Sequence, residues 1–183
     1  MRLARSERRE QLLDAATRAF ARSGFAATSL DDVATEAGVS RVILYRHFES
    51  KADLYRTALA RAAEQLATAS ESEFGGPAVT ELLRWAEANP AGFRLLFHHA
   101  AREPDFRAEA DQLRAEMVIA VRRNLTELIP DRAWADWAAQ LGTTTAIEAI
   151  MAWLDAGRPD PDQAATRIGD AVAGVIQAAR PRS

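Results

Sequence analysis

Apolar residues recur at intervals of three and four positions along almost the whole 183-residue chain. This spacing places them on one face of an α-helix, whereas a half-buried strand would need polar and apolar residues in alternation. Alternating segments of Val, Ile and Thr are absent from the sequence. Five of the seven prolines stand near expected helix starts, where proline is tolerated. The chain is therefore expected to be all-α, with about nine helices.

The composition restricts the class of protein further. The chain is 48% hydrophobic and 27% charged, which is ordinary for a folded protein and too apolar for a disordered one. No apolar run approaches the roughly 18 residues of a membrane span, and no apolar segment follows the charged start. With no cysteine, disulfides and thiolate metal sites are excluded. We expect a cytoplasmic protein with no membrane partner.

Residues 29–48 have the layout of a helix-turn-helix motif. Ser29 and Asp32 resemble a capping box that starts a helix, and Gly38 ends it. Ser40 then caps a very short helix that ends near Phe48. Such a short helix cannot hold itself together and must be clamped by its neighbours.

The two sides of this short helix differ in character. Leu44 and Phe48 are four residues apart and face inward, whereas Val42, Ile43 and Tyr45 fall on the other side. The alternative is a core helix that links two longer ones, but that would leave the outer side without a role. We therefore expect the outer side to enter a DNA major groove.

Each outer residue type suits that contact. Arg41 can bond to guanine with two donors, and Val42 can pack on a thymine methyl group. Lys51 is expected in the first turn of the next helix, where free backbone N–H groups also bind phosphate. The side chain of His47 can equally cover the core. The expected DNA contacts are Thr28, Ser40, Arg41, Val42, Ile43, Tyr45, His47 and Lys51.

Charge is distributed unevenly along the chain. Its net charge is −3, which by itself argues against a nucleic-acid binder. Residues 1–56 nevertheless carry a net charge of +2, and the remainder carries −5. This mild concentration of basic residues supports a phosphate-facing surface at one end.

The stretch TSLDDVATEAGVSRVILYRHFESKADLY, residues 28–55, resembles the TetR family of transcriptional regulators. The matching residues are Thr28, Val33, Ala34, Ala37, Gly38, Val39, Ser40, Leu44, Tyr45, His47, Phe48, Lys51 and Leu54. The resemblance implies a homodimer on a palindromic operator, and it implies the same DNA-contacting positions. Val42 and Ile43 depart from the small residue or Thr that relatives often have, so an operator inferred from a relative does not transfer.

The resemblance also implies a division of the chain by role. Residues 1–56 are expected to be the helix-turn-helix DNA-binding domain, and 57–77 a connector helix and loop, with the loop itself at 70–77. Residues 78–183 are expected to be the regulatory, ligand-binding and dimerisation domain. Its helices are expected at 78–88, 91–102, 105–129, 131–156 and 160–179.

Aromatic residues of this second domain are candidates for an effector pocket. The expected contacts are Trp85, Phe93, Phe97, Met117, Trp137 and Thr144, for a small apolar or aromatic effector. The alternative is that the aromatic residues are plain core. The hydroxyls of residues 143–145 stand in an apolar helix and need partners, either the helix's own carbonyls or a ligand.

The last two helices each have an apolar face that fits a four-helix dimer interface. The expected contacts are Ile147, Ile150, Met151, Leu154, Gly169, Val172, Ala173 and Ile176. The alternative is packing within one chain only.

His98, His99 and Glu103 could suggest a metal site, but none is expected, because adjacent histidines point to different faces of a helix. One buried and one exposed histidine is the plainer expectation. No cofactor and no catalytic group is expected. The sequence thus favours a ligand-responsive regulator, most simply a repressor, over a ligand-binding protein with a vestigial head or an enzyme.

Overall fold

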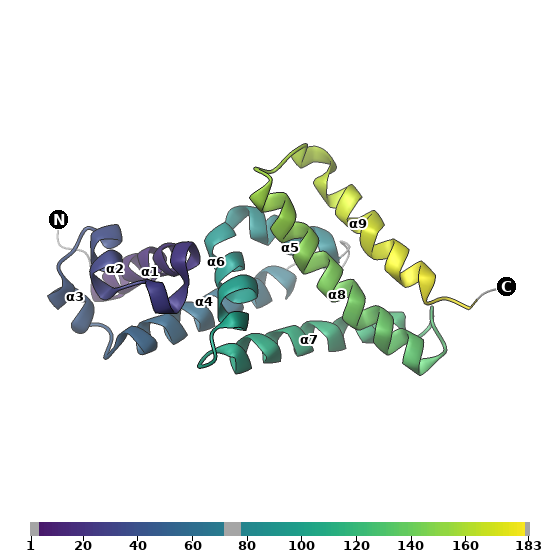
Figure 1. Cartoon of the computed structure of the whole chain (residues 1–183), viewed down its shortest axis with the longest axis horizontal. Coiled ribbons are helices and arrows are strands. Elements are labelled where there is room, and N and C mark those ends of the chain that lie inside the picture. Colours follow the sequence, from purple (N-terminus) through teal and green to yellow (C-terminus); the bar gives the residue numbers. More distant parts are fainter. Residues whose placement is uncertain (1–3, 72–77, 182–183) are drawn as a thin grey trace. The chain divides into compact units, whose positions relative to one another are not determined.

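The structure is a computed structural model that describes residues 4–71 and 78–181. Within these residues it contains nine α-helices and no strand, which confirms the all-α prediction (Figure 1). The α-helices are α1 (Arg5–Ala27), α2 (Leu30–Ala37), α3 (Arg41–Tyr45), α4 (Lys51–Glu71), α5 (Ala78–Ala88), α6 (Pro90–Arg94), α7 (Arg107–Leu125), α8 (Arg132–Asp155) and α9 (Pro161–Ala178). Most of the loop predicted at 70–77 lies outside the described residues.

The helix predicted at 91–102 is a composite of three forms. α6 passes into a π-helix, η1 (Leu95–His99), and then into a 3-10 turn, η2 (Ala100–Arg102). Glu103 ends it with an extended backbone, φ −92° and ψ 117°, as expected of a residue that precedes a proline. None of the described helices is both long and apolar enough to cross a lipid bilayer.

The described chain divides into two compact units. Unit 1 comprises the residues up to Thr68 together with Asn89–Ala110, and unit 2 comprises Ala69–Ala88 and the residues from Asp111 onward. The division predicted at 56 and 77 concerns roles rather than compactness, and it stays a prediction.

Unit 1 is built around the inner faces of α1, α2 and α4. Its fully or nearly buried side chains include Leu12, Leu13, Phe20, Val33, Leu44, Phe48, Leu54, Tyr55 and Phe106. Phe20 and Tyr55 meet edge to face at 4.8 Å between ring centroids, and Tyr55 lies 4.4 Å from Phe106. On the outside, Arg18 and Arg22 both bond to Glu36 and tie α1 to α2. These contacts fix the frame on which α3 rests.

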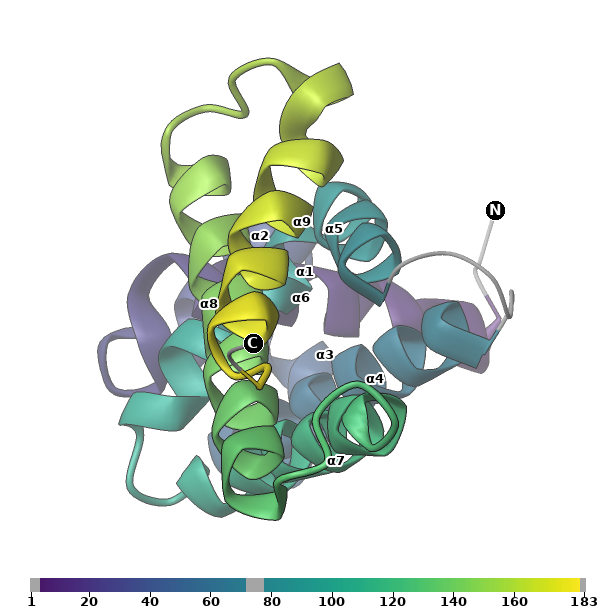
Figure 2. The same ribbon diagram turned by 90° about the vertical axis from the view of Figure 1, so that its right-hand side faces the viewer.

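Unit 2 is dominated by α8 and α9, which run side by side (Figures 1 and 2). A small residue permits close approach, since a Cβ added to Gly142 would lie 3.8 Å from a methyl group of Val172. The Asp131 carboxylate caps the start of α8 by accepting from the N–H groups of Ala133 and Trp134. A cluster of buried residues forms part of the core of unit 2: Leu125, Ile129, Ala135, Ala138, Ala139 and Ala179.

Candidate nucleic-acid interface

Local signals in the sequence set the junctions of α2. The Ser29 hydroxyl accepts from the Asp32 N–H at 3.1 Å, and the Asp32 carboxylate accepts from the Ser29 N–H at 2.7 Å. This is the predicted capping box, and the bonds from the Ser29 hydroxyl and N–H lower the pKa of the Asp32 carboxyl. Gly38 ends the helix at φ +66°, in the left-handed region that favours glycine. The predicted layout of the motif is confirmed at these positions.

α3 separates its inward and outward residues as the sequence predicts. Leu44 is 1% exposed, whereas Val42 is 61% and Tyr45 is 51% exposed. The helix is only five residues long, because a turn follows at Arg46 and His47. A five-residue helix is not stable alone, so its position depends on Leu44, Phe48 and the surrounding helices. The exposed aliphatic and aromatic side chains are thus held on a supported ridge.

Arg41 is already engaged on this surface. Its guanidinium donates to the Asp31 carboxylate at 3.2 Å and to the Tyr45 hydroxyl at 3.1 Å. The Tyr45 hydroxyl, and then the Asp31 charge, raise the pKa of the Arg41 guanidinium. All three side chains are exposed, so the bonds compete with water and are weak. Arg41 can exchange these partners for others without a large loss.

Lys51 and Thr28 serve a turn of the protein itself. The Lys51 ammonium donates to the carbonyls of Phe25 at 2.8 Å and Thr28 at 3.0 Å, and it lies over the Phe25 ring. The Thr28 hydroxyl is buried and donates to the Gly24 carbonyl at 2.7 Å. The sequence predicts that both side chains contact phosphate. The structure instead employs the Thr28 hydroxyl internally and leaves Lys51 one further N–H to donate.

Arginines near the start of α1 add positive charge beside α3, and they are not among the DNA contacts predicted from the sequence. Burial lowers the pKa of His47, and the charges of Arg5, Arg9 and Arg8 lower it further. Arg9 also lies 5.0 Å from the centre of the Phe48 ring. The signal for this cluster was the i, i+3, i+4 spacing of Arg5, Arg8 and Arg9, which places them on one side of a helix.

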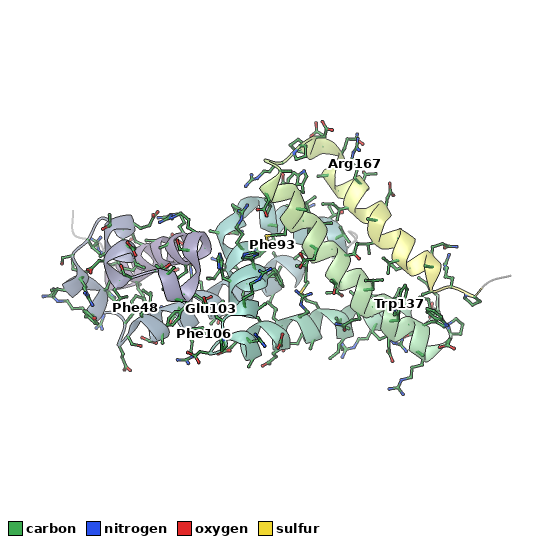
Figure 3. All side chains as sticks on the ribbon, viewed as in Figure 1. Phe48, Phe93, Glu103, Phe106, Trp137 and Arg167 are labelled. Atoms are coloured by element: carbon green, nitrogen blue, oxygen red, sulfur yellow. The ribbon has the colours of Figure 1, made fainter. Side chains whose placement is uncertain are left out.

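A second missed feature lies where α1 is interrupted. Gly24 has φ +76° and ψ 177°, a non-helical conformation almost restricted to glycine. The Glu103 carboxylate accepts from the N–H of Phe25 at 3.0 Å, and His99 Nε2 lies 2.9 Å from the Ala21 carbonyl oxygen. Figure 3 labels Glu103 beside Phe106, and the Phe106 ring lies 4.8 Å from that of Phe25. Both histidines at 98 and 99 are half-buried, so the expected split into one buried and one exposed is wrong.

The six expected effector contacts divide between the two units. Phe93 and Phe97 are buried in unit 1. Trp85, Met117, Trp137 and Thr144 belong to unit 2, where Trp137 is 41% exposed. Thr143, beside this set, is buried and its hydroxyl has no hydrogen-bond partner among the described residues. The alternative that its own helix satisfies this hydroxyl is therefore wrong, while the pocket itself stays a prediction.

The expected dimer contacts on α8 are covered within the single chain. Ile147, Ile150, Met151 and Leu154 are at most 8% exposed, because they form the inner face of unit 2. On α9, Gly169, Val172 and Ile176 are half-buried and Ala173 is exposed. The large apolar side chains that α8 does expose are Trp134, Trp137 and Leu141. The exposed apolar face of α8 therefore differs from the face predicted to form the dimer interface, and the interface itself stays a prediction.

Comparison with known proteins places these features in a family. Residues 12–58 match the model of the bacterial regulatory proteins of the tetR family. The chain is 36% identical over 107 residues to the HTH-type transcriptional activator FasR of Mycolicibacterium smegmatis, covering 54% of this chain and 49% of FasR. The N-terminal part of this chain is a regulatory domain of the tetR family. The resemblance noted at residues 28–55 is thereby confirmed.

Two further proteins show how far the likeness extends. The HTH-type transcriptional regulator TtgR of Pseudomonas putida is 46% identical over 70 residues, or 37% of this chain and 33% of TtgR. This chain thus spans about half of FasR and a third of TtgR. A TetR-like transcriptional regulator from Rhodococcus sp. RHA1 has a TM-score of 0.78 at 22% identity, covering 96% of this chain and 97% of that one. That likeness shows the fold.

Proposed function

We propose that this chain is a homodimeric, ligand-responsive transcriptional regulator that binds a palindromic operator and leaves it when a small effector binds. The observation that carries the proposal is the supported α3 ridge, on which Val42, Tyr45 and Arg41 are exposed beside a basic helix start. Exposed aliphatic groups contact thymine methyls, and arginine recognises guanine. A ridge built only for packing would have no reason to expose them.

The predicted DNA contacts divide into two kinds on this ridge. Arg41, Val42 and Ile43 are assigned to base edges, and Tyr45 and His47 to phosphates. Ser40 is assigned to a phosphate contact at the start of α3. Thr28 supports the DNA-binding surface by shaping the turn that precedes α2. The arginines at the start of α1 add attraction that does not depend on sequence.

Dimerisation is assigned to α8 and α9. The exposed Trp134 and Trp137 meet edge to face at 5.5 Å, next to the exposed Leu141. Large exposed apolar side chains grouped on one helix favour burial in a partner. In such a dimer the two α3 helices enter successive major grooves about 34 Å apart.

The effector is proposed to be a small apolar or aromatic molecule with a polar group. The buried Thr143 hydroxyl lacks a partner, and the Thr144 hydroxyl lies 3.5 Å from the Arg114 guanidinium. A ligand that satisfied these groups would favour the conformation it binds. Each 1.4 kcal/mol by which it favours the state unable to span the operator weakens operator affinity about tenfold.

We propose that the protein is cytoplasmic and that it represses transcription by occupying its operator. FasR is named an activator, so the sign of regulation needs its own measurement. A reporter gene placed behind the selected operator gives it: expression falls with this protein if it represses and rises if it activates.

The test of the proposal is selection of bound duplexes from a random-sequence DNA pool. An enriched palindrome with half-sites about one helical turn apart supports it. Binding without any enriched sequence would show that the helix-turn-helix domain does not recognise a specific DNA sequence, and it would overturn the proposal. Compounds that release the selected duplex then identify the effector class.

A further inference from the structure

The break in α1 falls between two backbone groups that would pair with each other in an uninterrupted helix. In an uninterrupted helix the Phe25 N–H would donate to the Ala21 carbonyl, four residues earlier. Gly24, at φ +76° and ψ 177°, lies between them and is non-helical. A buried or half-buried helix end needs substitutes for such bonds.

Two side chains from one distant segment supply those substitutes. His99 Nε2 lies 2.9 Å from the Ala21 oxygen, and since a carbonyl oxygen only accepts, Nε2 carries the proton. The Glu103 carboxylate accepts from the Phe25 N–H at 3.0 Å and, more weakly, from the Ala26 N–H at 3.5 Å. The two bonds stand on the two sides of the break, so they hold it at one angle.

A larger residue at position 24 would be strained, because Gly24 has φ +76° and side-chain atoms lie close to it. A Cβ added to Gly24 would lie 3.1 Å from a Glu103 carboxylate oxygen and 3.1 Å from His99 Nδ1. The two side chains therefore reach the glycine itself. The two hydrogen bonds each join residues 78 positions apart in the sequence, and both flank the same break.

The turn held in this way leads directly into the helix-turn-helix motif. Phe25 and Thr28 are bound through their carbonyls to Lys51, and the Thr28 hydroxyl bonds back to Gly24. Ser29 follows at once as the cap of α2. The N–H side of the turn is thus bound by Glu103 and the carbonyl side by Lys51. Glu103 is thus connected to the start of α2 through this bonded turn.

We propose that His99 and Glu103 are positioning residues for DNA recognition, because they replace the helical bond lost at Gly24 and so set the angle at which α2 and α3 leave α1. His99 ends the π-helix η1, a form with one extra residue per turn that is frequent at functional sites. Conversion of η1 to an ordinary α-helix would turn the following residues by about 100° and withdraw both side chains from the turn. The effect on operator affinity rests on the DNA binding proposed above.

The test compares Glu103→Ala with Asp105→Ala in the full chain. Asp105 is an exposed carboxylate two residues away, so the second variant makes the same change of charge without touching the turn. We expect Glu103→Ala to weaken binding of the selected operator about tenfold, with an unchanged dependence on salt. Glu103→Gln keeps an acceptor oxygen and should recover part of this loss. His99→Ala should reduce operator affinity less when it is added to Glu103→Ala than when it is made alone.

Amide hydrogen exchange provides a readout that does not need DNA. Glu103→Ala should speed exchange at residues 25–26 and also within residues 29–48, while residues 111–181 stay protected as in the parent protein. Faster exchange confined to 25–26, with unchanged operator affinity, would overturn the proposal. Equal losses of affinity for operator and random-sequence DNA would also overturn it, because they would show that the helix-turn-helix domain is merely unstable. If the parent protein bound no DNA at all, the proposed function would fail, and exchange at 29–48 would still decide the role of the pair.

Discussion

Two substitutions on the same short helix should separate stability from DNA recognition. Leu44→Ala should lower the stability, and Val42→Ala should lower the preference for the operator. Leu44 is 1% exposed and is the only buried residue of α3, whereas Val42 is 61% exposed. Replacing a buried Leu by Ala lowers the free energy of unfolding by about 2–5 kcal/mol, because apolar burial is lost and a cavity is left. Val42→Ala removes methyl groups that already face water, so we expect less than about 0.5 kcal/mol.

The chain offers an internal control for this comparison. All four tryptophans lie in unit 2, at positions 85, 134, 137 and 153, whereas α3 lies in unit 1. Urea unfolding followed by far-UV circular dichroism reports both units, and tryptophan fluorescence reports unit 2. Leu44→Ala should lower the midpoint of the circular dichroism transition associated with unit 1 and leave the fluorescence transition in place.

Binding to the selected operator completes the comparison. Val42→Ala should leave the unfolding transitions unchanged and reduce the preference for the operator over random-sequence DNA by roughly tenfold. Equal stability losses for the two variants, or a Leu44→Ala protein as stable as the parent, would refute the assignment of inward and outward faces.

Further substitutions test separate parts of the account. Arg41→Ala should relax sequence preference at one base pair of each half-site by roughly 10- to 100-fold in selections, and an unchanged preference would remove Arg41 from the base readers. Asp31→Asn removes the carboxylate that Arg41 contacts at 3.2 Å, so operator affinity should rise a few-fold at low salt; weaker binding would show that the pair prepares Arg41 for DNA. Ser29→Ala should bring the pKa of the Asp32 carboxyl back toward its usual value in an NMR titration. Because that pKa is lowered in the folded protein, the capping bonds stabilise it above the unfolded pKa and are lost as pH falls through the folded one, so the stability gap between Ser29→Ala and the parent should close in acid. Trp137→Glu should shift sedimentation toward the monomer, while Arg132→Ala, at an exposed position on another side of the same helix, should not.

Local chemistry explains what the sequence predicted well. A capping box at Ser29, a left-handed glycine at Gly38 and the i, i+4 pair at Leu44 and Phe48 each act over a few residues. The signal is contained in the segment that it shapes. The helix-turn-helix layout and the exposed face of α3 were therefore predictable from one chain without its structure.

Contacts between distant segments could not be predicted from the sequence. The spacing of apolar residues shows that Ile147 and Ile150 share a face of α8, but it does not say whether α9 or a second chain covers that face. Thr28 matched an expected phosphate donor, yet its hydroxyl closes the turn after Gly24. The pairing of Glu103 with the Phe25 N–H joins residues 78 positions apart, and no periodicity reports it.

Hydroxyl-radical footprinting on the selected operator tests the central claim most directly. Two α3 helices of one dimer should protect two half-sites about one helical turn apart on the same face of the duplex. Arg41→Ala should leave the spacing of the protections unchanged while weakening both. A single protected half-site, or uniform protection that does not depend on the operator sequence, would contradict recognition by a paired helix-turn-helix.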